Sequence, residues 1–354
     1  MMNELDTLLA AIPQPDDRAA AEARARWDAL AKPLDSLGLL EDAVTQIAAC
    51  TGSADVCLNR RALVVFCADN GVVKRGVTQC GSAVTASVAR DLAAGHSAVS
   101  PMARLANCAV LPVDVGMSTD APVPGVLDRR VQRGTGDIAA EPAMTRETCL
   151  AAIRTGAALA SEQARIGVRL LAVGEMGIGN TTTAAAVAAA LLGLSPEQVV
   201  GRGAGLSDAG LSRKRDAVAA ALRVNLPDAS DPVDVLAKVG GLDLAAMCGA
   251  YLGAAAARLP VLMDGFISSV AALCAVRLCP AASHAILASH VSPEPAARLV
   301  LDAMEKRPLL TAELRLGEGS GAVAAMPLLD MALAVYHSGE TFARRGIEPY
   351  KRLS

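Results

Sequence analysis

The stretch AVGEMGIGNTTTAAAVAAALL, residues 172–192, joins a short apolar run, a glycine loop and an alanine-rich segment of helical composition. This order predicts a strand, a tight turn and the start of a helix. Backbone N–H groups at such a turn point toward a ligand, and the helix dipole favours negative charge there. The residues that would let the backbone approach a ligand, or would offer it hydroxyl groups, are Gly174, Gly177, Gly179, Thr181, Thr182 and Thr183. The stretch therefore predicts an anion site.

A second glycine turn, residues 199–217, carries Arg202 and Lys214, so a phosphate group would fit both turns. The first loop is not a P-loop, because the chain contains no Gly-Lys-Ser/Thr tripeptide. It also lacks the third glycine of the dinucleotide-binding fingerprint. A tight turn without a ligand is the remaining alternative, and it would leave Glu175 and Asn180 unexplained.

Glu175 is an acid beside an expected phosphate, so it should serve another group, such as a sugar hydroxyl or a basic ring. This combination points to a nucleotide monophosphate held at both ends. The only Asp-Asp pair, Asp16–Asp17, lies in the N-terminal region. The paired acids with which magnesium-dependent transferases bind diphosphate donors are therefore missing from every predicted strand end. Ribose transfer from a diphosphate donor is therefore disfavoured.

Continuous apolar runs alternate with alanine-rich helical stretches through most of the chain. This alternation predicts an α/β fold with a Rossmann-like parallel sheet and helices on both faces. Pro112 makes the second run the weakest strand prediction and a candidate edge strand. The predicted strands are residues 62–71, 109–116, 168–177, 259–265 and 284–292.

Polar residues stand at the carboxyl end of each predicted strand, which is the edge where open α/β sheets bind ligands. The alternative is that the acids only cap the helices that follow. The residues are Asp69, Asp114, Glu175, Asp264 and the pair Ser289–His290.

Helical patterns return at both ends of the chain. Residues 17–49 have helical spacing, with Asp17 as the expected N-cap and Pro33 as a break. The last helical stretch, residues 322–347, would pack against them. We therefore predict a small helical domain from residues 1–58 and 331–354, and a large α/β domain from residues 59–330 that carries the active site.

Composition excludes several classes of function. The 354 residues are 53% apolar, carry a net charge of −3 and are only 2% aromatic, so neither a basic face nor stacking platforms are available for nucleic acid. No apolar stretch resembles a membrane-spanning helix. The nine cysteines form no C-x-x-C pair, and the first ten residues do not resemble a signal peptide. We expect a cytoplasmic protein with free thiols that binds neither nucleic acid nor membrane.

A second acid loop, ELRLGEGSGAVAAMPLL (313–329), places Glu318 between Gly317 and Gly319, just before an apolar helix. A glutamate flanked by glycines can face a crevice and lose contact with water. Burial disfavours the charged form of a carboxyl group and makes it a stronger base. The alternative is an ordinary exposed glutamate in a loop.

Five segments together resemble the nicotinate-nucleotide–dimethylbenzimidazole phosphoribosyltransferase family, whose members make the lower-ligand nucleotide of cobalamin. GEMGIGNTT (174–182) is that family's most distinctive motif, and the resemblance runs from about residue 20 to residue 345. The other segments, in the family's order, are PAMT (142–145), GGLDLAAMCGAYLGAAAARLPVLMDGF (240–266), SHVSPEP (289–295) and RLGEGSGAVAAMPLL (315–329).

The resemblance implies an enzyme that moves 5-phosphoribose from nicotinate mononucleotide to 5,6-dimethylbenzimidazole without a metal or cofactor. It also implies a homodimer whose active sites lie near the interface. Glu318 would be the catalytic base. The expected substrate-binding residues are Cys80, Glu175, Met176, Gly177, Ile178, Gly179, Asn180, Thr181, Thr182, Arg202, Gly203, Lys214, Asp264, Ser292, Leu316 and Gly317.

The chain departs from the family pattern at several positions, and these departures leave the acceptor open. Some relatives act as paired paralogous subunits on phenols, so a phenolic acceptor and a heterodimer are the alternatives. The differing residues are Asn70 for histidine, Cys80 for serine, Asp137 for asparagine, Ala204 for threonine and Asp243 for glutamate.

Overall fold

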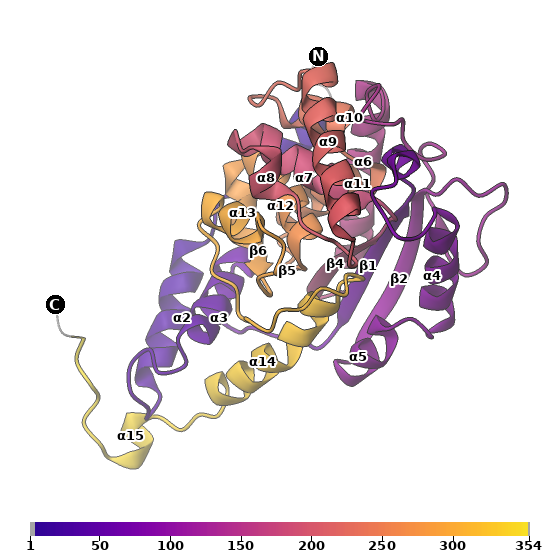
Figure 1. Ribbon diagram of the computed structural model, residues 1–354. Helices are drawn as coiled ribbons and strands as arrows, with labels where there is room; N and C mark the ends of the chain where they lie inside the picture. The colour runs from indigo at the N-terminus through magenta and orange to yellow at the C-terminus, as the bar shows by residue number, and fades with distance from the viewer. Residues whose placement is uncertain (1–3, 353–354) are drawn as a thin grey trace.

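The computed structural model describes residues 4–352 and contains a six-stranded, wholly parallel sheet (Figure 1). The strand order is β3-β2-β1-β4-β5-β6, so the chain runs outward from β1 on one side and outward from β4 on the other. Ligands of open α/β sheets bind outside the carboxyl ends of the strands at such a reversal. The strands are β1 (Arg61–Ala68), β2 (Cys108–Gly116), β3 (Leu127–Asp128), β4 (Leu170–Met176), β5 (Val261–Met263) and β6 (Ile286–Ala288).

The predicted parallel sheet is confirmed, with differences at its borders. Strand β3 was not predicted, because two residues are too short for any periodic pattern. Residues 280–285 form the 3-10 helix η2 (Pro280–Ala285), so the run 284–292 contributes only β6. Strand β3 pairs only with Val113 and Asp114. Pro112 therefore has a paired strand on one side only, which suits a residue without a backbone N–H.

Helices cover both faces of the sheet because successive side chains of each strand point in opposite directions. Val64 and Phe66 pack with one group of helices, whereas Leu63 and Val65 pack with the other. The first group is α6 (Arg146–Arg165), α7 (Asn180–Leu192), α9 (Asp208–Asn225), α10 (Pro232–Val239), α11 (Leu242–Ala256) and α12 (Phe266–Leu278). The second group is α2 (Asp17–Ala29), α3 (Leu39–Thr51), α4 (Ala83–Ala94), α5 (Val99–Leu105) and α14 (Ser320–Tyr336).

The remaining helices are short. They are α1 (Glu4–Ala10), η1 (Gly71–Arg75), α8 (Pro196–Val199), α13 (Ala297–Ala303) and α15 (Phe342–Arg345). Between residues 4 and 352, no helix combines the length and the apolar character needed to cross a membrane.

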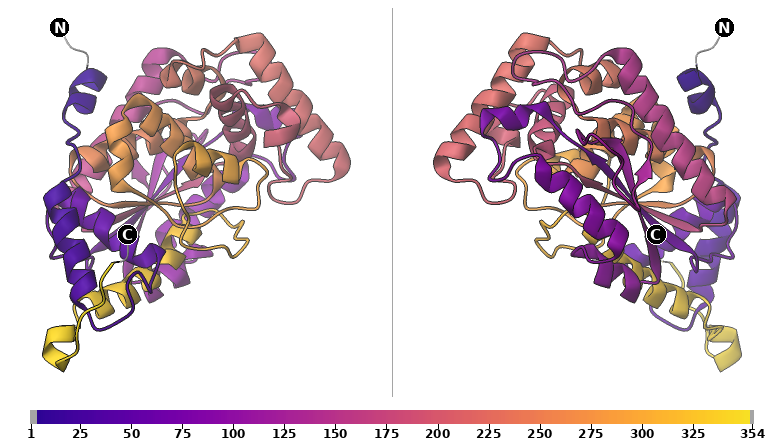
Figure 2. Two further views of the ribbon diagram at one scale, coloured as in Figure 1. Left: turned by 90° about the vertical axis from the view of Figure 1, so that its left-hand side faces the viewer. Right: turned by 90° about the vertical axis from the view of Figure 1, so that its right-hand side faces the viewer.

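The two ends of the chain lie together, as predicted: α2 and α3 lie beside α14 (Figures 1 and 2). Their side chains Trp27, Ile47 and Leu329 share one apolar cluster with Leu63 of β1. The predicted domain boundary at residue 331 falls inside α14, and a separate small domain stays a prediction. The break at Pro33 is confirmed, whereas the expected N-cap was wrong by one residue.

Helix α2 is capped by Asp16, whose carboxylate accepts a hydrogen bond from the Ala19 N–H at 2.9 Å. An N-cap bonds the N–H of the third helical residue, and only Asp16 stands outside the helix to do so, because Asp17 is already its first residue.

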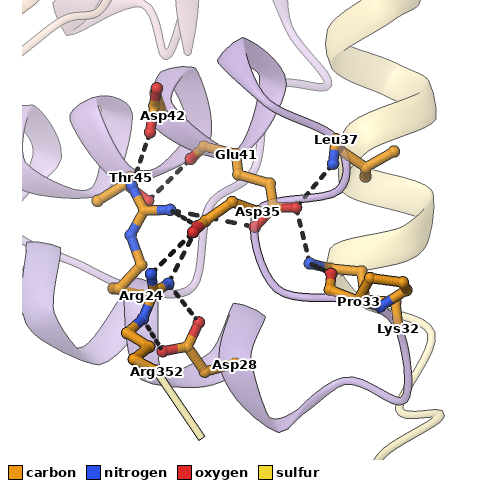
Figure 3. A network of polar contacts seen from close by, with 10 residues as sticks. All are labelled: Arg24, Asp28, Lys32, Pro33, Asp35, Leu37, Glu41, Asp42, Thr45 and Arg352. Carbon is orange, nitrogen blue, oxygen red and sulfur yellow. Dashed lines mark hydrogen bonds and ion pairs between the residues drawn. The ribbon is translucent and has the colours of Figure 1, made fainter. Parts of the chain in front are cut away.

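Ion pairs tie the last residues of the described chain to the N-terminal helices (Figure 3). The Arg352 guanidinium donates to both Asp28 and Asp35, with N···O distances of 2.8–3.0 Å. Nearby, Lys32 lies 2.7 Å from the fully buried carboxylate of Glu41, which also accepts from the Leu37 N–H. Segments from opposite ends of the sequence therefore form one surface.

Candidate functional site

A cavity of about 320 Å³ lies at the carboxyl ends of β4 and β5, beside the strand-order reversal. Loops from distant parts of the chain complete its wall. All but one of the predicted site residues line it: Cys80, Glu175, Met176, Gly177, Ile178, Gly179, Asn180, Thr181, Arg202, Gly203, Lys214, Asp264, Ser292, Leu316, Gly317 and Glu318.

The exception is Thr182, which was expected to bind substrate but does not line the cavity. Its side chain is completely buried, because the third residue of α7 turns toward the core while Thr181 faces the cavity. Arg202 does line the cavity, yet its guanidinium already donates to the Leu206 carbonyl at 2.7 Å and pairs with Asp208.

One corner of the cavity, here named the anion corner, contains the ammonium group of Lys214, the first turn of α7 at Thr181 and the glycine turn 201–205. The Lys214 ammonium group donates to Thr181 Oγ1 at 2.8 Å and to the Gly201 carbonyl at 3.2 Å. Burial lowers the pKa of Lys214 to about 8, and the Glu294 carboxylate acts against that shift. A buried ammonium beside the first turn of α7 can pair with a phosphate, as the two glycine turns predicted.

Sequence reasoning missed Glu294, which holds this corner together. Its Oε1 accepts the Gly203 N–H at 3.0 Å, while Ser292 Oγ accepts the Glu294 N–H at 3.3 Å. Both residues line the cavity. Glu294 stands in the segment SHVSPEP, but nothing in that segment indicated that an acid would bind the distant glycine turn 201–205.

Glu175, at the end of β4, belongs to a buried polar cluster. The side-chain amide of Asn180 donates to Glu175 and also to Asp243, the latter at 2.9 Å. Burial raises the pKa of Glu175 to about 8, opposed by the Asn180 bond and increased by the nearby acids Asp243, Asp264 and Glu318. Burial likewise raises the pKa of Asp243 to about 6. A protonated Glu175 can donate a hydrogen bond, as a residue that binds a sugar hydroxyl or a basic ring would.

Glu318 is nearly buried, with 9% of its surface exposed, so the alternative of an exposed loop glutamate was wrong. The backbone of Gly317, Glu318 and Gly319 has φ values of +83°, +59° and +82°. A left-handed conformation is uncommon for a residue other than glycine. The Glu318 Oε2 atom accepts a hydrogen bond at 3.1 Å from the Val99 N–H, at the start of α5.

The two acid loops lie against each other. A Cβ atom on Gly174 would lie 2.5 Å from the Gly319 nitrogen, and one on Gly317 would lie 2.8 Å from Glu175 Oε1. Gly174 is therefore required for close approach of the two backbones, and Gly317 for its positive φ beside the Glu175 carboxyl group. The contact places Glu175 and Glu318 on one wall of the cavity.

Another part of the wall is apolar. Val77, Val88, Met176, Leu314 and Leu316 line it together with the exposed thiol of Cys80. Such a surface can take a flat ring. The departures from the family pattern fall partly here, at Cys80, and partly behind the cavity, where Asp243 bonds Asn180.

The polar residues predicted at the strand ends divide into two sets. Glu175, Asp264 and His290 line the cavity, whereas Asp69, Asp114 and Ser289 do not. Asp114 accepts from the Gly116 and Met117 N–H groups and pairs with Arg130, and Asp69 accepts from the Ser118 N–H. Both acids thus bind backbone N–H groups of residues 116–118 and neither caps the helix that follows its strand, so the capping alternative was wrong for them as well.

Comparisons with known proteins agree with the resemblance. A family model described as phosphoribosyltransferase matches residues 12–347. The chain is 46% identical, over 94% of both chains, to the nicotinate-nucleotide–dimethylbenzimidazole phosphoribosyltransferase of Ruminiclostridium cellulolyticum. It is 45% identical to the enzyme of the same name from Acetivibrio thermocellus, over 92% of this chain and 93% of that one. A crystal structure of CobT from Thermus thermophilus superposes with a TM-score of 0.88 at 44% identity, covering 94% of this chain and 99% of the other.

Proposed function

The chain belongs to this phosphoribosyltransferase family, and from that premise we propose that it transfers 5-phosphoribose from nicotinate mononucleotide to 5,6-dimethylbenzimidazole. The products are nicotinate and α-ribazole 5′-phosphate, in cobalamin biosynthesis. One observation carries the proposal: the buried base Glu318 and the anion corner at Lys214 line the same cavity. The relatives' names support the choice of both substrates.

The chemistry needs one base and accurate positioning. The benzimidazole nitrogen attacks the ribose C1′ while the bond from C1′ to the nicotinate nitrogen breaks. The electron pair of the broken bond returns to the nicotinate ring, which loses its positive charge as it leaves. Glu318 takes the N–H proton of the acceptor. Because the leaving group is already activated, a positioned general base and correct alignment account for the step.

Binding is divided over the cavity. The donor phosphate pairs with Lys214 and receives hydrogen bonds from Thr181 and the two glycine turns. A protonated Glu175 donates to the sugar or the nicotinate ring, which explains an acid in an anion site. The acceptor ring lies in the apolar part, between Cys80 and Leu316.

The test is direct. The purified chain alone is incubated with nicotinate mononucleotide and a panel of benzimidazoles, purines and phenols, and the ribotides are identified. We expect α-ribotides of benzimidazoles. Product only after addition of a paralogous chain would support a heterodimer, and no ribotide under any condition would overturn the proposal.

We also propose a homodimer in the cytoplasm. Leu105 of α5 and Met331 and Val335 of α14 are exposed apolar side chains on two helices that touch each other, so they could meet a second copy. All nine cysteines are free, as in a reducing compartment. Light scattering on the purified chain tests the assembly: a monomeric mass would contradict the homodimer.

A further inference from the structure

The loop that carries Glu318 does not hold its own shape. Glu318 has a φ of +59°, a left-handed conformation that costs energy for a residue other than glycine and persists only where surrounding contacts impose it. Helix α14 follows at once, and its N-cap, Gly319, has no side chain to bond the free N–H groups of the first turn. Those groups need an acceptor from elsewhere in the fold.

Asp264, at the end of β5, supplies that acceptor. Its Oδ2 accepts the Gly319 N–H at 3.2 Å, and its Oδ1 accepts the N–H groups of Gly321 at 2.7 Å and Ala322 at 3.2 Å. The carboxylate therefore holds the Glu318–Gly319 peptide and the start of α14 together. Hydrogen bonds to a carboxylate are short and strong, and negative charge is favoured at a helix N-terminus.

Asp264 is itself held in place. Its backbone N–H donates to Ser268 Oγ at 3.0 Å, at the start of α12, and Ser268 in turn lies 2.5 Å from the hydroxyl of the fully buried Tyr251. Asp264 is 4% exposed, with the His290 ring 3.5 Å from its Oδ1. The carboxyl end of β5, held by these bonds, therefore fixes the loop that carries Glu318.

We propose that Asp264 is a positioning residue that acts through Glu318, and not the substrate ligand that the sequence predicted. Both of its oxygens accept bonds from the backbone of the base loop and α14, which is the observation that carries the proposal. The inference rests on the proposed function, in which Glu318 is the base.

The test compares Asp264→Asn, Glu318→Gln and the double variant. Asparagine keeps the shape but has one acceptor oxygen, so it cannot bond both Gly319 and Gly321. Turnover is measured with saturating donor and acceptor, and donor affinity is measured by calorimetry with nicotinate mononucleotide alone. The matched control is Asp114→Asn, another buried strand-end acid that accepts two backbone N–H groups but lies outside the cavity.

We expect Asp264→Asn to lower kcat by about 10- to 100-fold, as misplacement of a reacting group does, with donor affinity within about threefold of wild type. The kcat of the double variant should be within about threefold of the kcat of Glu318→Gln, because the effects of residues that act as a unit are not additive. Asp114→Asn should keep the wild-type kcat. Donor affinity that falls in step with kcat, or factors that multiply in the double variant, would overturn the proposal.

Failure of this proposal can be distinguished from failure of the proposed function. If Asp264→Asn does not fold, Asp264→Glu decides: it keeps the charge but displaces it, so full activity would contradict positioning. If Glu318→Gln keeps near-normal turnover, the base assignment of the proposed function fails, whatever Asp264 does. A wild-type chain that makes no ribotide removes the proposed function itself.

Discussion

The backbone N–H of Val99 donates a hydrogen bond to the carboxylate of Glu318, although the two residues are 219 positions apart in the sequence. The bond takes up Oε2 and fixes the direction in which the side chain lies. Together with the bond from Gly319 to Asp264, it places the base between two rigid supports, α5 and β5. The chemical expectations for this site follow from that geometry.

Replacing Glu318 with glutamine should lower kcat by about 10²–10⁴-fold, which is the usual effect of losing a positioned general base. Donor binding should remain, because glutamine keeps the shape and the Val99 bond. The matched control is Glu313→Gln, an exposed glutamate that stands five residues earlier and outside the cavity. Normal turnover in Glu318→Gln would refute the assignment of the base.

Replacing Lys214 with methionine should weaken donor binding by about 1.5–3 kcal/mol, the value of a hydrogen bond to a charged group. Calorimetry with nicotinate mononucleotide measures it. Because the pKa of Lys214 is about 8, wild-type affinity should also fall between pH 7 and pH 9 as the ammonium loses its proton, and this part of the pH dependence should vanish in the variant. Lys306→Met is the control, since the half-buried Lys306 also has a pKa lowered to about 8 but lies outside the cavity.

Ser292→Ala should also weaken donor binding more than acceptor binding. Ser292 lines the anion corner and orients Glu294, which holds the glycine turn at Gly203. Titration of each ligand separately measures the effect. An equal loss of affinity for both ligands would mean that the donor phosphate does not bind at this corner.

Glu175 should make stability decrease as pH rises. Its pKa is about 8 in the folded chain against an ordinary value of 4.5, so between these values the folded state holds a proton that the unfolded state has released. The slope is at most about 1.4 kcal/mol per pH unit. Between pH 6.5 and 7.5, Asp243 and Lys214 add little. The folded and unfolded states bind different numbers of protons at Asp243 only below about pH 6, and at Lys214 only above about pH 8.

Urea unfolding of wild type and Glu175→Gln at pH 6.5, 7.0 and 7.5 tests this. The wild type should lose stability relative to the variant as pH rises, since glutamine does not titrate. A constant difference across the three pH values would show that Glu175 is already ionised in the folded chain.

Gly174→Ala should displace the base loop. The new Cβ would lie 2.5 Å from the Gly319 nitrogen and 2.8 Å from the Glu318 carbonyl carbon, and neither backbone atom can move freely. Overpacking of this kind costs about 1–3 kcal/mol, and kcat should fall with it. Gly81→Ala is the stability control, because a Cβ there meets open space. Unchanged stability in Gly174→Ala would mean that the two acid loops separate easily.

The acceptor should be a benzimidazole. Glu318 has only to take the N–H proton of a benzimidazole, whereas a phenol has a pKa of about 10 by analogy with tyrosine, and its phenolate would need a cation to stabilise it. Three Lys or Arg side chains line the cavity: Lys214 belongs to the anion corner, Arg202 is bonded to Leu206 and Asp208, and Arg315 is exposed and lies 3.9 Å from Glu313, so none of them is a buried, unpaired cation that would stabilise a phenolate. Equal amounts of 5,6-dimethylbenzimidazole and p-cresol should give the benzimidazole ribotide. A predominantly phenolic product would change the acceptor but not the family.

The sequence by itself determined the parallel sheet, the strand-end acids and both acid loops, because these depend on local patterns: apolar runs, glycine turns and helix starts. It could not decide which acids would face the cavity. Asp114 and Glu175 both stand near the carboxyl end of a strand, yet Asp114 is level with Cys67 of β1 and Glu175 with Phe66, and only Glu175 lies on a strand at the strand-order reversal. Neither register nor strand order is a local property.

Tertiary structure alone decided how the base is held. Glu318 meets Val99, and Asp264 bonds the first turn of α14, although 219 and 55 residues of chain separate these partners. Thr182 shows the same limit within a single motif, since the packing of α7 turns its side chain into the core. Periodicity assigns a residue to a strand or helix, but the hydrogen bonds of a buried carboxylate depend on which backbone groups the fold leaves without partners, and those become known only once the elements are packed.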